Sequence, residues 1–473
     1  MSDERPAARV GARANGEQRE RWSGERAERH LRSLELFGMR FGLDRMRRMM
    51  TVLGSPERRF RSIHVVGTNG KSSTTRLTAA ILERHGLATG AYLSPHLVSY
   101  TERVQIGEHD IAMHAFAAAV ARAAWAAERV NRTLAEDDHV TQFELLTAAA
   151  FWALAEHGVE VAVVEAGLGG RYDATAVIES TVTALTSVGL EHTRWLGPTV
   201  RDIAAEKLAV LKPGTTLAVG VDLDAEALAL ARSVAHEREA RLVSAALDGT
   251  HGPAAVGSAE IAAEPQLARG SFQRRNFALA RVAAEAYLRS AGIPLREDAV
   301  REAAASTAVP GRLQVVAESP LTILDGAHNP DAVVALVEAL PELLGASPPR
   351  RELGLVMGVL EDKDAASMLR RLLPLCTRAW FTAPPSSRAL SPAALQSLAR
   401  QLGFEEASCE PQPRRALERA QAWARARETA AVLVTGSVYL VGDVLAGIAA
   451  AGESGDRAGS PQRRSESGVG GRK

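Results

Sequence analysis

The sequence predicts an α/β protein, with a P-loop parallel sheet in an N-terminal domain and a smaller, Rossmann-like α/β domain after it. Short apolar runs alternate with amphipathic or alanine-rich helical stretches along most of the 473 residues. Such alternation is typical of parallel sheets that are covered by helices on both faces. Hydrophobic residues make up 46% of the chain, which is enough for a large core and for two or three domains.

The alternation of strands and helices occurs in two blocks. In the first block we expect strands at 62–66, 89–93, 160–165, 182–187 and 215–219, and helices at 72–85, 114–130, 142–156, 200–211, 224–237, 273–290 and 297–306. The segment 242–270 is ambiguous, and short antiparallel strands are one reading of it. In the second block we expect strands at 321–324, 353–357, 379–382 and 431–435, separated by helices.

Composition sets the expected domain boundaries. Residues 1–27 and 452–473 are polar and charged, so we expect disordered tails there. Between them we expect a central domain at 28–308 and a C-terminal domain at 309–451, with Pro310-Gly311 as a hinge. The apolar stretch 430–452 is interrupted by polar residues, and it is typical of a buried strand and helix rather than of a membrane span.

Charge and cysteine content exclude several classes of protein. Lys+Arg and Asp+Glu both number 56, which argues against nucleic-acid and membrane partners. Two cysteines, Cys376 and Cys409, provide neither a disulfide framework nor a metal-binding spacing. The arginine-rich N-terminus lacks the apolar region of a signal peptide. A cytoplasmic protein is therefore expected.

Lysine is rare in this chain. Lys71, Lys207, Lys212, Lys363 and Lys473 are the lysines, and all other basic side chains except histidine are arginine. A lysine is therefore expected where an amine is chemically required, although chance accounts for such a distribution as well.

The segment from Val65 to Ser73 has the pattern of a phosphate-binding loop. It follows an apolar run, contains Gly67 and Gly70, and opens a helical pattern at Lys71-Ser72. Backbone N–H groups and the positive end of a helix favour anionic oxygens, and a lysine there would neutralise the β- and γ-phosphates. Val65 stands where the common pattern has its first glycine, so the loop is a shorter variant. The alternative is an ordinary glycine-rich turn beside a surface lysine.

Charged residues follow two other expected strands. Glu165 ends one buried run before a glycine-rich turn, and Glu191-His192 come just after another. Ligands of open α/β sheets bind at the carboxyl ends of strands, so Glu165 is placed to bind a metal ion near the phosphate loop. A capping or salt-bridged carboxylate is the alternative for Glu165. A structural or exposed side chain is the alternative for His192.

Two further segments carry reactive side chains. Lys207 lies on a helix in an apolar neighbourhood, where burial would lower its pKa; a surface ion pair is the alternative. Asp325 follows a strand of the second block, and its carboxylate could accept a hydrogen bond from a ribose hydroxyl. His328 could reach a phosphate or a base. Asn329 and Pro330 are typical of a helix N-cap and first helical position.

Taken in order, these segments resemble the folylpolyglutamate synthase/dihydrofolate synthase family of the Mur ligase superfamily. The similar segments lie between about Glu35 and about Ala450: they are 67–72, 94–104, 164–175, 191–193, 205–207, 212–214, 310–312, 325–330 and 436–440. The chain departs from the family at Ser72, Ala176 and Glu191, where glycine, asparagine and aspartate are usual.

The resemblance implies roles for individual residues, with an ATPase-like N-terminal domain. ATP would be held by Gly67, Thr68, Asn69, Gly70, Lys71, Ser72 and Ser73, with Asn276, Arg312, Asp325 and His328 closing from the far side. Two Mg²⁺ ions would be bound by Ser94, Glu165, His192 and Lys207, the last as a carbamate formed with CO₂. Lys71, Lys207 and His192 would be catalytic. Pterin contacts would come from Phe41, Gly42, Leu43, Asp44, Thr141, Gln142, Phe143, Glu144, Tyr172, Asp173 and Ala174.

The resemblance also implies the activity: an ATP-dependent amide ligase that adds L-glutamate to dihydropteroate, to folates or to both, through an acyl phosphate. Its partners would be small-molecule substrates, with no nucleic acid or membrane, and a monomer is expected. Three alternatives stay open. They are folylpolyglutamate synthase activity alone, a cell-wall ligase that joins amino acids to a UDP-sugar, and a regulatory P-loop ATPase that does not need glutamate.

Overall fold

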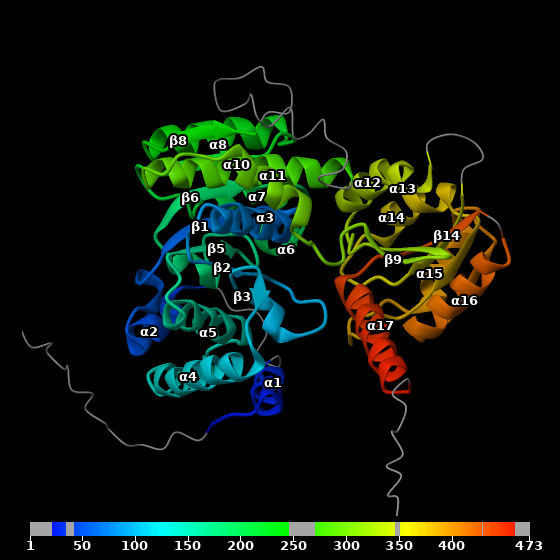
Figure 1. Cartoon of the computed structure of the whole chain (residues 1–473), viewed down its shortest axis with the longest axis horizontal. Coiled ribbons are helices and arrows are strands. Elements are labelled where there is room, and N and C mark those ends of the chain that lie inside the picture. The colour runs from blue at the N-terminus through cyan, green and yellow to red at the C-terminus, as the bar shows by residue number, and fades with distance from the viewer. Residues whose placement is uncertain (1–20, 35–41, 246–269, 346–350, 428, 459–473) are drawn as a thin grey trace, which may run out of the picture.

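The computed structural model describes residues 21–34, 42–245, 270–345, 351–427 and 429–458, and it shows two α/β units side by side (Figure 1). The chain passes from the first unit to the second after residue 306. Each unit has its own sheet and its own buried apolar clusters. Within these residues, no helix is long and apolar enough to cross a membrane.

The N-terminal unit contains an eight-stranded sheet in the order β4-β3-β2-β5-β1-β6-β7-β8. β2, β5, β1, β6, β7 and β8 are parallel, and β3 and β4 form an antiparallel edge. The strands are β1 Arg61–Val66, β2 Thr89–Tyr92, β3 Val104–Ile106, β4 His109–Asp110, β5 Val161–Glu165, β6 Ser180–Leu185, β7 Thr216–Val219 and β8 Arg241–Ser244. Because β1 lies between β5 and β6, the segments that follow these three strands meet at one edge.

Helices cover both faces of this sheet. α3, α10 and α11 pack on one face, and α5, supported by α1, α2 and α4, covers part of the other, beside α7 and α8. Their bounds are α1 Gly24–Ser33, α2 Asp44–Leu53, α3 Lys71–Arg84, α4 Met113–Asn131, α5 Gln142–Glu156, α6 Thr193–Leu196, α7 Val200–Leu208, α8 Ala225–Glu237, α10 Ser271–Ser290 and α11 Glu297–Ser306. Short 3₁₀ helices occupy Pro56–Arg58, Tyr100–Arg103 and Ala174–Val177.

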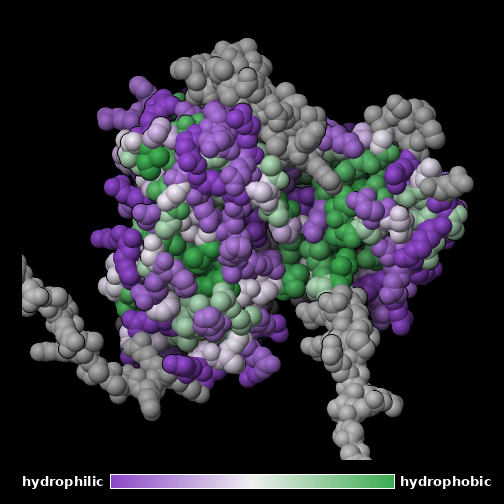
Figure 2. All heavy atoms as spheres, viewed as in Figure 1, coloured by the Kyte–Doolittle hydropathy of each residue, from purple (hydrophilic) through white to green (hydrophobic). Residues whose placement is uncertain are grey.

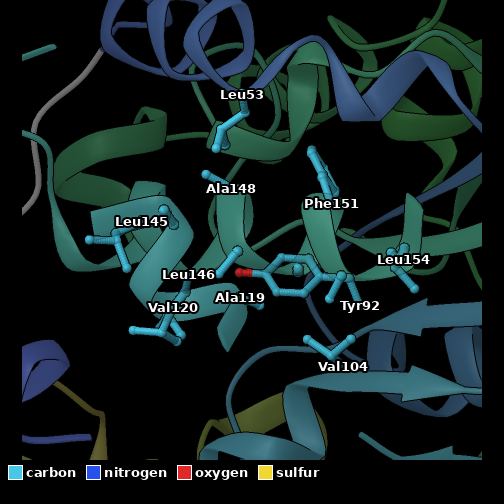
Figure 3. Close-up of a cluster of buried hydrophobic side chains, with 14 of the residues drawn as sticks. Leu53, Tyr92, Val104, Ala119, Val120, Leu145, Leu146, Ala148, Phe151 and Leu154 are labelled. Atoms are coloured by element: carbon cyan, nitrogen blue, oxygen red, sulfur yellow. The ribbon is translucent and has the colours of Figure 1, made fainter. Parts of the chain in front are cut away.

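The apolar cluster between α5 and the sheet surrounds Tyr92 (Figure 3). The Tyr92 ring lies among side chains that include Leu146, Phe151 and Val104. Its hydroxyl is buried but is paired with the hydroxyl of Thr147 at 3.0 Å, so the core accommodates the polar atom without leaving it unsatisfied.

The C-terminal unit contains a six-stranded sheet in the order β13-β12-β11-β14-β10-β9, in which β9 alone is antiparallel to its neighbour. α12, α13, α14 and α15 lie on one face, and α16 and α17 lie on the other. The bounds are β9 Gln314–Glu318, β10 Leu321–Leu324, α12 Pro330–Ala339, α13 Pro341–Leu344, β11 Glu352–Met357, α14 Ala365–Leu372, η5 Leu373–Leu375, β12 Arg378–Phe381, α15 Pro392–Gln401, β13 Ala407–Cys409, α16 Pro413–Arg425, β14 Ala430–Thr435 and α17 Val438–Ala458.

The two units differ in the surface that they show in one view (Figure 2). Hydrophilic side chains cover most of the N-terminal unit, whereas apolar residues gather on the part of the C-terminal unit that carries α17. Tyr439 and Ile448 of α17 are among the exposed large hydrophobic residues.

The predicted α/β class is confirmed, and each predicted strand begins and ends within two residues of its expected bounds. Three expectations were wrong. α1 begins at Gly24, inside the segment expected to be a disordered tail, because Ala27 and Leu31 pack into the core. α17 continues to Ala458, beyond the expected boundary at 451. β8 pairs in parallel with β7 rather than antiparallel, and residues 246–269 of that ambiguous block lie outside the described residues.

Other elements were not predicted. β9 and β13 are edge strands, and the β3–β4 hairpin is short, so their apolar signal is weak. None of these elements carries a predicted site residue.

A buried ion pair joins α2 to α5. The Arg45 Nε atom donates to Glu144 Oε1 at 3.0 Å, and Arg45 Nη1 also donates to Asp138 at 3.0 Å. Glu144 closes a capping box with Thr141 at the start of α5, since its Oε2 atom accepts from the Thr141 N–H at 2.8 Å. Both partners of the Arg45–Glu144 pair are largely buried, with side-chain exposures of 8% and 6%.

We expect Glu144→Gln to lower the free energy of unfolding by about 3 kcal/mol, because it removes the buried one of the two carboxylates that pair with Arg45 and leaves only the more exposed Asp138. The measurement is the urea-induced unfolding midpoint and slope followed by circular dichroism. Arg48→Met, which removes an exposed ion pair on the same helix, should cost less than about 1 kcal/mol. Equal losses from the two variants would contradict this account of the Arg45–Glu144 pair.

Candidate active site

The phosphate-binding loop lies between β1 and α3, pressed against the segment that follows β6. The Thr68 N–H donates to Ser187 O at 2.8 Å, and the Asn69 N–H donates to Ser187 Oγ at 2.9 Å. Gly67 has a φ of 153°, and a Cβ at this residue would collide with the Thr186 hydroxyl. Glycine is therefore required at position 67 by contact as well as by conformation.

The Lys71 ammonium folds back over this loop. Its Nζ atom donates to Gly67 O at 3.2 Å and to Thr68 O at 3.1 Å. Lys71 is the first residue of α3, so the ammonium adds to the positive end of the helix. Loop, lysine and helix start therefore lie together as the sequence predicts, and anion binding by them stays a prediction.

Glu165 ends β5 beside the start of α3. Its carboxylate accepts from the Ser72 hydroxyl at 2.9 Å and from the Ser94 N–H at 3.1 Å. The side chain is buried, and burial raises the pKa of Glu165, while Lys71 and these two hydrogen bonds counteract the rise. A buried carboxylate between two hydroxyl-bearing residues can accept a cation as a further partner.

Glu191 and His192 follow β6, on the other side of the loop from Glu165. His192 has a φ of 53°, a left-handed conformation that is uncommon outside glycine, and 36% of its side chain is exposed. Burial of the rest of the ring lowers the pKa of His192. The His192 Nε2 atom is 3.8 Å from Glu191 Oε1.

Lys207 lies on α7, and its side chain reaches the phosphate loop. Its side chain is buried, and its Nζ atom donates to Gly67 O at 2.8 Å. Burial, reinforced by the nearby Lys71 ammonium, lowers the pKa of Lys207 to about 7. The alternative of a surface lysine paired with an acid is therefore excluded by the structure.

A polar cavity of about 160 Å³ brings most of these groups together. It is lined by Thr68, Asn69, Gly70, Lys71, Ser72, Ser73, Ser94, Pro95, Glu165, Gly167, Glu191, His192, Arg312, His328 and Val438. Three of the four predicted metal ligands, Ser94, Glu165 and His192, are therefore on its wall. Lys207 is not, because it lies behind Gly67.

The donor set of this cavity suits Mg²⁺ bound together with phosphate oxygens. Such sites use one or two carboxylates, with water and phosphate completing the octahedron. Glu165 supplies the carboxylate, and Ser72 and Ser94 supply neighbouring hydroxyl groups. Within the described residues, no three His, Cys, Asp or Glu side chains lie close enough together to hold a metal ion by themselves.

A second cavity of about 260 Å³ lies between the two units and shares the loop with the first. The predicted residues Asn276, Arg312, Asp325 and His328 all line it, and Asn276 on α10 stands directly against Gly70. Apolar and aromatic residues, including Val221, Phe272 and Leu279, form another part of its wall. A polar end at a phosphate loop and an apolar end match the two ends of a nucleotide.

The start of α12 faces this larger cavity. Asp325 is buried, and its carboxylate accepts from the Leu313 and Ala327 N–H groups at 2.9 and 2.8 Å. Burial raises the pKa of Asp325. The predicted helix cap is confirmed: Asn329 accepts from the Ala332 N–H at 2.8 Å, and Pro330 is the first helical residue.

The residues predicted to contact a pterin line neither cavity. Phe41 lies outside the described residues. Gly42, Leu43 and Asp44 lie at the start of α2, Thr141, Gln142, Phe143 and Glu144 at the start of α5, and Tyr172, Asp173 and Ala174 in the turn after β5.

Several of these residues have structural partners. Besides the Glu144–Arg45 pair, Gln142 donates to Leu31 O at 3.0 Å, and buried Asp173 accepts from the Leu168 N–H at 2.8 Å. Phe143 lies against Gly167, which does line the smaller cavity. Tyr172 is half exposed.

Sequence reasoning assigned no role to other residues at the site. Val188, Gly189, Gly220 and Asp222 follow the ends of β6 and β7 and line the larger cavity. Their position after predicted strands was the available signal. Lys363 was noted as a rare lysine, and the structure places it against Glu191 with an Nζ–Oε1 distance of 2.8 Å.

Comparison with known proteins gives consistent results for both units. Residues 311–438 match the family described as "Mur ligase, glutamate ligase domain". The folylpolyglutamate synthase of Lacticaseibacillus casei is 34% identical, over 74% of this chain and 84% of that protein. The dihydrofolate synthase/folylpolyglutamate synthase of Bacillus subtilis is 32% identical, over 86% of this chain and 95% of that protein.

Solved structures resemble the whole fold. Mycobacterium tuberculosis folylpolyglutamate synthase, complexed with ADP and AMPPCP, superposes with a TM-score of 0.78 at 28% identity. The superposition covers 89% of this chain and 99% of the Mycobacterium tuberculosis chain. Escherichia coli FolC, in complex with DHPP and ADP, gives a TM-score of 0.75 at 30% identity, over 90% and 98% of the two chains.

The buried Lys207 predicts a pH dependence of stability. Its folded-state pKa of about 7 is below the ordinary value of 10.5, so the unfolded chain binds a proton that the folded chain does not between these pH values. The free energy of unfolding should therefore decrease as the pH falls from 10.5 to 7, and this loss should be complete below pH 7.

Lys207→Met removes this titration. The free energy of unfolding of Lys207→Met minus that of the wild type should increase as the pH falls towards 7 and then stay constant, as measured by urea denaturation in CO₂-free buffer. Lys212→Met, at a more exposed lysine paired with Glu179, serves as the control for loss of a lysine, and the increase should be larger for Lys207→Met than for this variant. A flat difference for Lys207→Met would contradict the buried amine.

Proposed function

The chain belongs to the folylpolyglutamate synthase/dihydrofolate synthase family and is an ATP-dependent ligase that adds glutamate to folates, and we propose that it does so through an acyl phosphate formed in the smaller cavity. The observation that carries this proposal is the pair of cavities that share Asn69, Gly70 and Ser73 of one phosphate loop. The larger cavity would hold the nucleoside, and charged groups of the smaller cavity would face its terminal phosphates.

The proposed reaction joins an acid to an amine. A carboxylate oxygen of dihydropteroate or of a folate attacks the γ-phosphorus of ATP, and ADP leaves. The neutral amine of L-glutamate then attacks the acyl carbon and loses one proton, an amide bond forms, and inorganic phosphate leaves with the electron pair of the broken carbon–oxygen bond. The chain's main task is to bring two anions together, which positioning and positive charge accomplish.

Lys71, the loop N–H groups and the start of α3 would reduce the repulsion between carboxylate and triphosphate. Arg312 and His328, which line both cavities, would contact the nucleotide from the C-terminal unit. Asn276, which lies against Gly70, would contact the nucleoside beside the phosphate loop. Asp325, whose two oxygens already accept backbone N–H groups, retains lone pairs for a ribose hydroxyl.

We also propose two Mg²⁺ ions, held by Glu165, Ser94, His192 and phosphate oxygens. When bound, Mg²⁺ would neutralise phosphate charge in the transition state. Lys207 is proposed as a carbamate that assists the second site. Its support is the lowered pKa, because only a neutral amine adds CO₂.

The pterin is proposed to lie beside the turn after β5, against α2 and α5. The contact between Phe143 and Gly167 supports this, since it links the pterin set to the wall of the smaller cavity. We further propose a cytoplasmic monomer with small-molecule partners, in line with its balanced charge and two free cysteines.

The first test is the coupling between ATP consumption and glutamate. With ATP, Mg²⁺ and dihydropteroate, phosphate release should increase at least about tenfold when L-glutamate is added, because the acyl phosphate is consumed only by the amine. Mass spectrometry of products from dihydropteroate and from tetrahydrofolate would identify the acid substrate. Phosphate release at one rate with and without glutamate would instead favour a regulatory ATPase.

The second test concerns Lys207. Lys207→Ala should lower ligation at least about a hundredfold, and added short carboxylic acids should restore part of the activity by replacing the carbamate. Lys207→Arg should stay inactive, because a guanidinium does not add CO₂ in this way. Full activity of Lys207→Ala without an added acid would refute the carbamate.

A further inference from the structure

One carboxylate connects the two units at the mouth of the smaller cavity. Glu191, which follows β6, accepts from Lys363 Nζ at 2.8 Å, and its Oε1 atom also lies 3.5 Å from His328 Nε2. Lys363 and His328 both belong to the C-terminal unit, in the segments that follow β11 and β10. A single side chain of the N-terminal unit therefore contacts two cationic or polar groups of the other unit.

This contact is shielded from water. The side chains of Lys363 and Glu191 are only 10% and 12% exposed. An exposed ion pair contributes little, whereas loss of one partner from a buried pair leaves an uncompensated charge. The Glu191–Lys363 pair is buried, so loss of either partner would leave an uncompensated charge.

A second contact lies across the same boundary. The amide groups of Asn69 and Asn329 form reciprocal hydrogen bonds of 2.9 and 3.3 Å. Asn69 belongs to the phosphate loop, and Asn329 caps α12 of the C-terminal unit. Beside them, Asp331 of α12 lies so close to Gly189 that a side chain at position 189 would collide with it. The phosphate loop and the segment after β6 are thus both in contact with the start of α12.

We propose that Glu191 is a positioning residue: by holding Lys363 and His328, it fixes the C-terminal unit over the phosphate loop and keeps Asn69 and Asn329 paired. This inference rests on the proposed function, since its purpose is to align groups of the two units for one reaction. It assigns no contact with the reacting atoms to Glu191.

The alternative is that the units are held by their other contacts and that Glu191 is dispensable. Arg274 and Glu342 also form an ion pair across the boundary, with an Nη2–Oε1 distance of 2.7 Å, but their side chains are 21% and 36% exposed. Glu342 therefore provides a matched control: the same substitution at another inter-unit pair, neither partner of which lines a cavity.

The first measurement is hydrogen exchange of the ligand-free protein. In Glu191→Gln, the amides of Thr68, Asn69 and Ala332 should exchange at least about fivefold faster than in the wild type. The reason is that the phosphate loop is no longer held against the start of α12. In Glu342→Gln these amides should stay within about twofold of the wild type. Unchanged exchange in Glu191→Gln, or equal acceleration in both variants, would overturn the proposal.

The second measurement is steady-state kinetics. Glu191→Gln should lower kcat by about tenfold while the KM for ATP rises less than about threefold, because misalignment affects the reaction more than binding to the loop. Lys363→Met should have an effect of similar size, and the double variant should be no worse than the single ones. If the loss of kcat in the double variant equalled the product of the two single losses, the two residues would act independently, and the proposed Glu191–Lys363 pairing would be overturned.

Two outcomes keep this inference separate from the proposed function. Accelerated exchange in a protein that does not ligate glutamate would contradict the proposed function but support the inter-unit contact. If the wild type ligates glutamate but Glu191→Gln has normal exchange and a normal kcat, the proposed function is supported and the positioning role of Glu191 is contradicted. Should Glu191→Gln fail to fold, Lys363→Met carries the test by the same criteria.

Discussion

The close packing of the phosphate loop against the end of β6 is the contact on which the rest of the site depends. Gly67 lies where a Cβ would meet Thr186, and its carbonyl accepts from Lys71 on one side and from Lys207 on the other. The loop is therefore held by a backbone contact and by two lysines that no arginine could replace without changing the geometry. Because β1 is flanked by β5 and β6, the same packing brings Glu165 and His192 to one cavity.

Buried charges are the energetic consequence of this arrangement. Burial raises the pKa of Glu165 and Asp325 and lowers that of Lys207, so each of these groups is less stable in its charged form than it would be in water. A protein selected for stability alone would replace such groups with apolar residues. Their concentration around one loop, together with the left-handed backbone of His192, is typical of a site where chemistry rather than folding sets the choice of residue.

Sequence reasoning located the parts of this site that depend on local patterns. The alternation of apolar runs predicted the parallel strands, and strand ends predicted the place of Lys71, Glu165 and Asp325. Contacts between distant segments could not be predicted in this way. The pairing of Lys363 with Glu191 joins positions that are 172 residues apart, and the Arg45–Glu144 pair joins positions 99 residues apart. The start of α1 was missed because only Ala27 and Leu31 of that polar helix are buried.

The proposed acyl phosphate must be shielded from water while a second substrate is still admitted. Both cavities lie where the two units meet, so the protection of the intermediate depends on how the units are held. Contacts made of a few polar groups, such as Asn69–Asn329 and Glu191–Lys363, are directional and fix register, yet each is small enough to be broken and remade. Apolar contacts accompany them, since Phe272 and Leu97 of the N-terminal unit pack against apolar clusters of the C-terminal unit. Because apolar attraction has no preferred direction, the polar pairs are the contacts that align the groups of the two units for a reaction with two successive substrates.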